Sequence, residues 1–254
     1  MEIERDLHTP LCDILGCRYP ILQAGMGGYG FLGMVRETPD LIAQEIDAVR
    51  ARTDGPFGVN LIPAATEPAL LQAELSICFK KRVHSLCFFW DVHADVIAQA
   101  KAAGCCVLYQ VGSIEGAVAA EKAGVDAIIA QGFEAGGHVH GTVSSLVLLP
   151  QVVRAASIPV VASGGFPSGE SLIAALALGA QGIHCGTVFL ATDESFAHAY
   201  HKNRMVRATS EDTVYTDAFA INWPSDSPVR VIANSPEELG QRLLGHDPQD
   251  ILSR

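Results

Sequence analysis

Short apolar runs alternate with helix-like segments along this chain, and that repeat constrains the fold more than any other feature. Each run has the length and nearly continuous apolar character of a buried parallel strand. Eight runs are present, at 20–24, 30–34, 57–60, 83–90, 105–110, 125–131, 158–162 and 182–185. The helix-like segments lie at 39–52, 67–81, 94–103, 113–123, 147–156, 168–178 and 194–207. Eight strands in 254 residues predict an α/β fold, the (β/α)8 TIM barrel.

Polar residues and glycines directly follow most of these runs. They stand at 25–28, 60, 90–91, 110–112, 136–138, 163–165 and 186–187. In a barrel these positions converge on the carboxyl face, which carries the active site. A doubly wound sheet also binds ligands at the carboxyl ends of its strands, so the pattern alone leaves that architecture open.

The connection between the first two runs is too short for a complete βα unit. Only residues 25–29 separate them, whereas a crossover between parallel strands needs a dozen or more residues. Either the first unit is incomplete, or a segment of the molecule is absent from the given sequence, or the second run is not a barrel strand.

A titratable imidazole, His138, follows a double glycine just beyond the run 125–131. Adjacent glycines let a flat ligand approach the main chain closely. Because an imidazole exchanges a proton near neutral pH, His138 is a candidate for general acid/base catalysis. Glycine turns also end strands without any further role, and the pattern favours neither interpretation. His140 is interpreted as a solvated loop residue.

Two late loops predict an anion site. Ser163, Gly164 and Gly165 follow the seventh run, and Gly186 and Thr187 follow the eighth. Barrels frequently bind a phosphate at these loops. The alternative is ordinary turn chemistry with a helix cap at Ser168. The chain has neither the dinucleotide fingerprint nor a P-loop, so the mononucleotide FMN is the expected phosphate-bearing cofactor.

Composition excludes several other classes of protein. The net charge of -11 disfavours nucleic-acid binding. The charged N-terminus and the lack of a long apolar run predict a cytoplasmic protein without membrane contact. The seven cysteines show no metal-ligand spacing, so we expect reduced, packed thiols and no metal site. We expect a single domain over residues 1–254, with a C-terminal helical segment at about 210–254.

Four motifs together resemble the nitronate monooxygenases, formerly called 2-nitropropane dioxygenases. They lie at 20–27, 131–138, 162–165 and 186–192, and the likeness extends to about Asn234. Its most specific part is the Glu-Ala-Gly-Gly-His loop combined with the Gln-Ala-Gly-Met opening. The resemblance implies an FMN-binding TIM barrel that oxidises alkyl nitronates with O2 to a carbonyl compound and nitrite. A homodimer is compatible with it.

The resemblance also implies a set of site residues. His138 matches the catalytic histidine, which takes the proton of a neutral nitroalkane or holds the nitro group of a nitronate. The residues implied to bind FMN are Ala24, Gly25, Met26, Asn60, Gln110 and Gly137, with Ser163, Gly164, Gly165, Gly186 and Thr187 at its phosphate.

The chain departs from the family pattern in two places. The family has a helix between Gly28 and Tyr29, which agrees with the short first connection. Family chains also continue beyond Arg254 with a helical segment near the flavin, so we expect weaker cofactor retention here. Residues 236–244 have the pattern of a capped amphipathic helix.

Other functions remain open at this point. An FMN-dependent enoyl-acyl-carrier-protein reductase, which takes electrons from NADH or NADPH, resembles the same barrel and Gly-Gly-His loop. A barrel that binds flavin, or nothing, without turnover is a second alternative. A flavin-free lyase or isomerase is disfavoured, because no pair of Lys or carboxylate residues accompanies His138. The sequence leaves open whether Phe88, Phe89, Trp90, Tyr109 and His184 line a pocket or the core.

Overall fold

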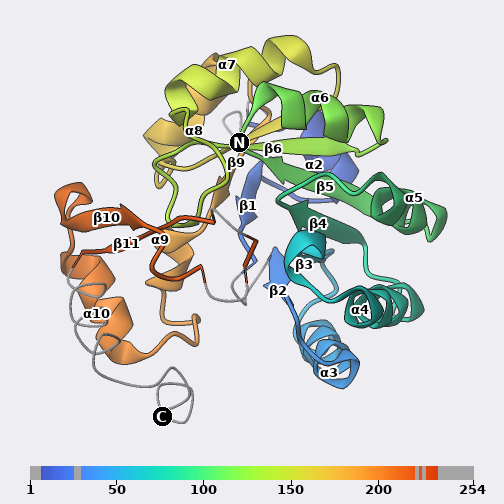
Figure 1. The fold of residues 1–254 in the computed structure, drawn as a ribbon. Coiled ribbons are helices and arrows are strands. Elements are labelled where there is room, and N and C mark those ends of the chain that lie inside the picture. The colour runs from blue at the N-terminus through green and yellow to red at the C-terminus, as the bar shows by residue number, and fades with distance from the viewer. Residues whose placement is uncertain (1–6, 26–29, 221–222, 225–226, 234–254) are drawn as a thin grey trace.

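The computed structural model describes residues 7–25, 30–220, 223–224 and 227–233. Within them, eight strands form one parallel sheet in the order β1-β9-β8-β6-β5-β4-β3-β2, which curves into a nearly closed barrel surrounded by helices (Figure 1). The strands are β1 (Ile21–Gln23), β2 (Phe31–Gly33), β3 (Gly58–Leu61), β4 (Ser85–Phe89), β5 (Cys106–Val111), β6 (Ala127–Gln131), β8 (Val160–Ser163) and β9 (Gly182–Cys185). Each overlaps a predicted run, so the TIM barrel is confirmed and the doubly wound alternative is wrong.

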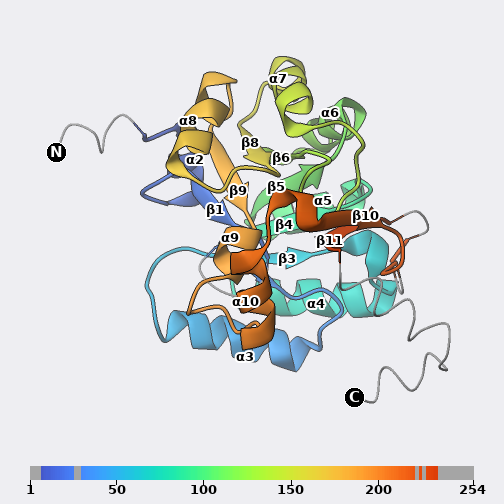
Figure 2. The same cartoon turned by 90° about the vertical axis from the view of Figure 1, so that its left-hand side faces the viewer.

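Helices cover the outer face of the sheet (Figures 1 and 2). They are α3 (Pro39–Arg50), α4 (Pro68–Lys80), α5 (Ala94–Ala102), α6 (Ile114–Lys122), α7 (Ser145–Ala155) and α8 (Gly169–Ala177), with a short 3-10 turn at η1 (Pro63–Ala65). Proline opens α3 and α4, and the side chains of Thr38 and Glu67 accept backbone N–H groups of the first turns. Among the helices that the structure describes, none is long and apolar enough to cross a bilayer.

Two apolar layers follow from the alternation of side chains along each strand. Leu86 and Phe88 of β4 belong to the large core between the sheet and the helices, whereas Cys87 lies in a second cluster inside the barrel. The strand residues of the inner cluster are Leu22, Phe31, Cys87, Leu108, Ala127, Ile129 and Val161.

A short helix that the sequence pattern did not predict, α2 (Pro10–Leu15), closes the amino end of the barrel. It places Leu11 and Leu15 in the inner cluster. Thr9 anchors it, because its hydroxyl donates to the carbonyl oxygen of Gln181, just before β9, at 2.6 Å. Six residues are too few for a helical period to stand out in the sequence.

We expect Leu11→Ala to lower the free energy of unfolding by about 3 kcal/mol, because the change leaves a cavity at a fully buried site. Urea denaturation followed by far-UV circular dichroism measures this. Leu146→Ala is the matched control, since Leu146 is 68% exposed and its truncation changes stability by less than about 0.5 kcal/mol. Equal stabilities of the two variants would contradict the assignment of α2 to the core.

The barrel has a seam between β1 and β2. These strands stand at the two ends of the sheet order, and no ladder joins them within the described residues. β2 pairs in parallel with β3, so the second apolar run is a barrel strand and the interpretation of it as a segment outside the barrel is wrong. The two edges still touch, because a Cβ at Gly30 (φ +119) would lie 2.9 Å from Cβ of Gln23.

The chain beyond β9 differs most from the prediction. It forms α9 (Thr187–Leu190), α10 (Ala199–Arg207), a 3-10 turn η2 (Ser210–Asp212) and the strands β10 (Thr213–Thr216) and β11 (Val229–Ile232). The predicted helical segment at 210–254 is therefore wrong for the described residues between 210 and 233, where β-branched residues and Tyr215 favour strands. Residues 234–254, with the predicted helix at 236–244, lie outside the described residues.

β10 and β11 pair antiparallel, and β11 also pairs antiparallel with the short strand β7 (Gly137–His138). β7 lies in the loop that follows β6, so this three-stranded sheet lies at the carboxyl face of the barrel (Figure 2). The strand ladder thereby holds together residues that are more than 90 positions apart, since Val229 is paired with His138 and Arg230 with Gly137.

Candidate active site

The inward-facing side chains of the barrel change from apolar to polar at the carboxyl ends of the strands. Leu108 of β5 and Ile129 of β6 lie in the inner apolar cluster, so Gln110 and Gln131, two residues further on, face the same interior. The same alternation brings Asn60, Ser163 and His184 into this layer. The predicted FMN ligands Asn60, Gln110 and Ser163 therefore lie in one layer of polar side chains inside the barrel.

The side chain of Gln131 holds the loop that carries His138. Its amide nitrogen donates to the carbonyl oxygen of His138 at 2.9 Å, and its Oε1 accepts from the backbone N–H of His140 at 3.4 Å. Gln131 is 4% exposed and lies at the end of β6. We assign it as a positioning residue, a role that the motif alone did not reveal.

His138 lies half-buried in β7 with its ring stacked on Trp223, at 3.6 Å between centroids and 16° between planes. Nε2 is buried and has no hydrogen-bond partner among the described residues. Burial lowers the pKa of His138 to about 4; the guanidinium of Arg36 acts in the same direction, and a hydrogen bond with the backbone of Phe219 opposes them. At neutral pH the imidazole is thus uncharged and can accept a proton.

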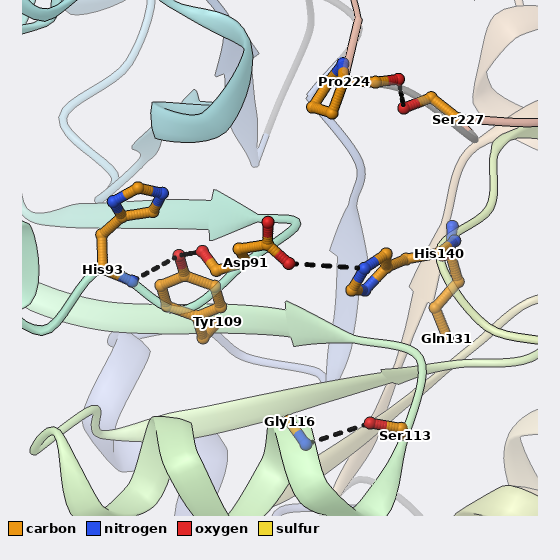
Figure 3. Close-up of polar contacts among 9 residues, drawn as sticks. All are labelled: Asp91, His93, Tyr109, Ser113, Gly116, Gln131, His140, Pro224 and Ser227. Atoms are coloured by element: carbon orange, nitrogen blue, oxygen red, sulfur yellow. Dashed lines mark hydrogen bonds and ion pairs between the residues drawn. The ribbon is translucent and has the colours of Figure 1, made fainter.

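An aromatic wall adjoins this histidine. Trp90 follows β4 in a left-handed conformation (φ +83) and contacts both Trp223 and His140, at centroid distances of 5.6 and 4.5 Å. Figure 3 shows His140 facing Asp91, with Nε2 of His140 3.7 Å from Oδ1 of Asp91. His140 is exposed as predicted, but its ring is packed rather than freely solvated.

The predicted phosphate loops lie together. Gly164 (φ +90) and Gly165 (φ +80) follow β8, and a Cβ at Gly164 would lie 3.1 Å from Cβ of Ala135. A Cβ at Gly136 would lie 2.8 Å from Oγ1 of Thr187, the first residue of α9. The loops after β6, β8 and β9 therefore pack against one another.

A phosphate site at Gly164 and Gly165 and a helix cap at Ser168 are compatible with each other. Ser168 does cap α8, because its hydroxyl accepts the backbone N–H of Ser171 at 3.4 Å. The glycines at 164 and 165 precede this cap, so the cap does not use them. Oγ of Ser163 is 3.2 Å from Nδ1 of His184, inside the barrel.

Other residues that the resemblance implies for FMN binding, at the ends of β1 and β3, also lie at the carboxyl face. A Cβ at Gly25 would lie 2.6 Å from Cβ of Asn60, so only glycine fits there. The Asn60 amide donates to the carbonyl oxygen of Cys87 at 3.0 Å, and the N–H of Ala24 donates to that of Cys185 at 2.8 Å. Met26 lies outside the described residues.

Two of the residues that the sequence left open between pocket and core belong to the core. Phe88 and Tyr109 are fully buried in the outer core. The hydroxyl of Tyr109 donates to the carbonyl oxygen of Asp91 at 2.5 Å and accepts from the N–H of His93 at 3.3 Å (Figure 3), while burial raises its pKa. Phe89 and Trp90 instead belong to a small cluster with Ile62 beside the site.

The cysteines behave as packed thiols. All seven are free, and burial raises the pKa of Cys17 and Cys185 to about 11 and that of Cys87 to about 12. In the part of the chain that the structure describes, no cluster of His, Cys, Asp or Glu could hold a metal ion.

The buried His184 makes folding sensitive to acid. Burial lowers its pKa from 6.5 to about 4, so the unfolded state binds the extra proton and stability falls as pH drops from 6.5 to 4. We expect His184→Gln to reduce the loss of unfolding free energy between pH 7 and pH 4.5 by about 2 kcal/mol. Urea denaturation at both pH values measures this.

His201→Gln is the control for this experiment, because it removes an exposed histidine from α10. It should leave the pH dependence unchanged. If the His184 and His201 variants lose stability equally on acidification, His184 is not the group responsible.

Comparisons with known proteins agree with this geometry. A match to the family described as nitronate monooxygenase covers residues 9–238. A probable nitronate monooxygenase of Staphylococcus aureus (strain Newman) is 32% identical over 270 aligned positions, which include 83% of this chain and 75% of that protein. The (3aS,4S,5R,7aS)-5-hydroxy-7a-methyl-1-oxo-octahydro-1H-indene-4-carboxyl-CoA dehydrogenase of Mycobacterium tuberculosis is 38% identical, with coverage of 83% and 63%.

Two solved structures share the fold. FabK of Thermotoga maritima superposes with a TM-score of 0.84 at 33% identity, covering 96% of this chain and 80% of that one. The nitroalkane oxidase of Streptomyces ansochromogenes superposes with a TM-score of 0.76 at 32% identity, covering 88% and 79%. The chain therefore belongs to the nitronate monooxygenase family, whose members are flavin-dependent oxidoreductases built on a TIM barrel.

Proposed function

We propose that this protein oxidises alkyl nitronates with O2 to a carbonyl compound and nitrite. The observation that carries the proposal is His138, an uncharged imidazole whose buried Nε2 has no partner in the described residues at the carboxyl face of the barrel. Membership in the family and the likeness to a nitroalkane oxidase support this activity over others.

We propose FMN as the flavin, and the residues present fit it. Gly137 (φ +80) has open space where a Cβ would stand, which leaves room for a flat ring against the main chain. Ser163, Gly164, Gly165, Gly186 and Thr187 would hold the phosphate. Ala24, Gly25, Asn60, Gln110 and Gly137 would hold the ring system, with Met26 as a further prediction. When bound, the flavin supplies the electron transfer from the nitronate and the reaction with O2.

The protein contributes orientation and proton handling. With a neutral nitroalkane, Nε2 of His138 accepts the proton from the carbon that bears the nitro group, and the nitronate forms in place. With a preformed nitronate no proton is removed, and the imidazole holds the nitro group as an N–H donor, in the tautomer that carries its proton on Nε2. Gln131 keeps the His138 backbone in position, and Trp223 shields one face of the ring from water.

The visible absorbance spectrum of the purified protein, mixed anaerobically with propionate 3-nitronate, tests the proposal. Bleaching of a bound flavin, followed by nitrite release once O2 is admitted, supports nitronate oxidation. A bound flavin that stays oxidised with the nitronate but bleaches with NADH or NADPH would replace it with the reductase function. Folded protein without flavin, even after incubation with FMN, would favour a non-catalytic barrel.

The reductase is the second candidate because FabK superposes over nearly the whole chain. The similarity to a dehydrogenase of a carboxyl-CoA compound likewise makes an acyl thioester a substrate to include in the assay. A single FMN-binding domain over residues 1–254, a cytoplasmic location and a homodimer remain predictions.

A further inference from the structure

The indole of Trp223 lies flat against the imidazole of the proposed base. The two ring centroids are 3.6 Å apart and the planes differ by 16°, which is van der Waals contact over the whole imidazole face. Trp223 also meets Trp90 edge-on, at 5.6 Å between the ring centroids. No substrate can enter between the indole and His138 in this arrangement.

The packing around Trp223 holds its indole in this place. Trp223 packs on the buried cluster of Ile62, Phe89 and Trp90, together with Val35. Its backbone N–H donates to the carbonyl oxygen of Ala220 at 3.0 Å.

The chain around Trp223 is also tied to the histidine loop. The hydroxyl of Ser227 donates to the carbonyl oxygen of Pro224 at 2.5 Å, and Figure 3 shows this pair above His140. The N–H of Val139, next to His138, donates to the carbonyl oxygen of Pro228 at 3.0 Å. Hydrogen bonds therefore link the neighbour of Trp223, Pro224, to Ser227, and link Pro228 to the neighbour of His138.

We propose that Trp223 is a specificity-determining residue that covers His138 and limits the size of the nitroalkanes and nitronates that reach it. This inference rests on the proposed function, since it assigns the substrate class of the same site. A substrate that reaches Nε2 has to share the space beside the imidazole with a fixed indole and the wall of Trp90, Phe89 and Ile62. A bulky chain, such as a cyclohexyl ring or an acyl thioester, is therefore disfavoured there.

The same cover keeps water from His138. Removing the indole exposes the ring, so the pKa of His138 should rise from about 4 towards its ordinary value of 6.5. The charged groups around it stay in place: Arg36 after β2, Arg230 on β11, and the facing pair Asp91 and His140 beyond Trp90.

The test compares Trp223→Ala with Trp223→Phe, which keeps an aromatic plane, in the protein loaded with flavin. Diethyl pyrocarbonate, which acylates neutral imidazole nitrogens, is the probe, and mass spectrometry of the peptide that contains His138 gives the labelling rate. We expect the rate at pH 7 to rise at least fivefold in Trp223→Ala and to change less than twofold in Trp223→Phe. In Trp223→Ala, the midpoint of the rate against pH should also move upward. Phe196→Ala is the control, since Phe196 is 95% exposed.

Turnover gives the second readout. We expect the ratio of kcat/KM for nitrocyclohexane to that for 1-nitropropane to rise at least tenfold in Trp223→Ala and to stay unchanged in Trp223→Phe. If Trp223→Ala does not fold, Trp223→Leu removes the aromatic plane with a smaller loss of volume.

The labelling rate and the substrate ratio together distinguish a failure of the role of Trp223 from a failure of the proposed function. Equal labelling rates and equal substrate ratios in folded wild type and Trp223→Ala would overturn the role of Trp223. Faster labelling in Trp223→Ala, with no nitronate oxidation by any variant, would support the cover over His138 and overturn the proposed function instead.

Discussion

Replacing His138 by alanine should lower kcat/KM for a neutral nitroalkane by about 10²- to 10⁴-fold, the range typical of losing a general base. Flavin absorbance of the purified variant should equal that of the wild type, because the imidazole is stacked on Trp223 rather than part of the phosphate loops. Turnover of a preformed nitronate should fall much less, since no carbon-bound proton remains to be removed. Nitrite release with each substrate measures this split.

His140→Ala is the matched control, because this second histidine of the loop packs on Trp90 and faces Asp91. Its turnover should stay within about threefold of the wild type. The pH profile adds a further check: with a pKa of about 4, His138 stays unprotonated at neutral pH, so nitroalkane turnover should fall only as pH drops through about 4. Equal losses in the His138 and His140 variants would remove His138 from the mechanism.

Replacing Gly164 by valine should raise the dissociation constant for FMN at least tenfold. Gly164 has φ +90, a conformation that costs a β-branched residue on the order of 1–3 kcal/mol, and a Cβ there would lie 3.1 Å from that of Ala135. Relieving the backbone strain or the contact with Ala135 displaces the loop proposed to hold the phosphate. Fluorescence quenching during titration of flavin-free protein with FMN gives the dissociation constant.

Gly104→Val separates strain from the loss of a binding site. Gly104 has φ +83 and nothing within 4 Å of its would-be Cβ, and it lies between α5 and β5 at the amino side of the sheet. It should lose a similar amount of stability without losing affinity for FMN. If both valine variants bind FMN as the wild type does, the loop after β8 is not the phosphate site.

The parts of this protein that the sequence predicts are those governed by local pattern. A buried parallel strand such as β6 needs only a short apolar run, and a pair of glycines such as Gly164 and Gly165 predicts a turn. His138 is a candidate because it directly follows another such pair, Gly136 and Gly137. The barrel, its eight strands and the grouping of the phosphate loops follow from these signals and the geometry of parallel sheets.

The features that the sequence did not predict depend on contacts between distant residues. β7 is a strand only because Val229 pairs with His138, and nothing near either residue signals the other. Trp223 lies on His138 although the two residues are 85 positions apart in the sequence. The sequence predicts Gln131 only as the last residue of a strand. Its hydrogen bonds to residues 138 and 140 depend on how the following loop folds back over the strand end.

The ladder between β7 and β11 has a consequence for synthesis of the protein on the ribosome. All eight barrel strands are complete once residue 185 has left the exit tunnel, but the segment that pairs with His138 emerges more than 40 residues later. Domains fold as their chain becomes available, so the barrel can close first and the loop that carries His138 is fixed last. A nascent chain that stops between these two points would have a native barrel without the pairing that fixes the proposed base, so any loss of activity would report incomplete synthesis before any loss of fold.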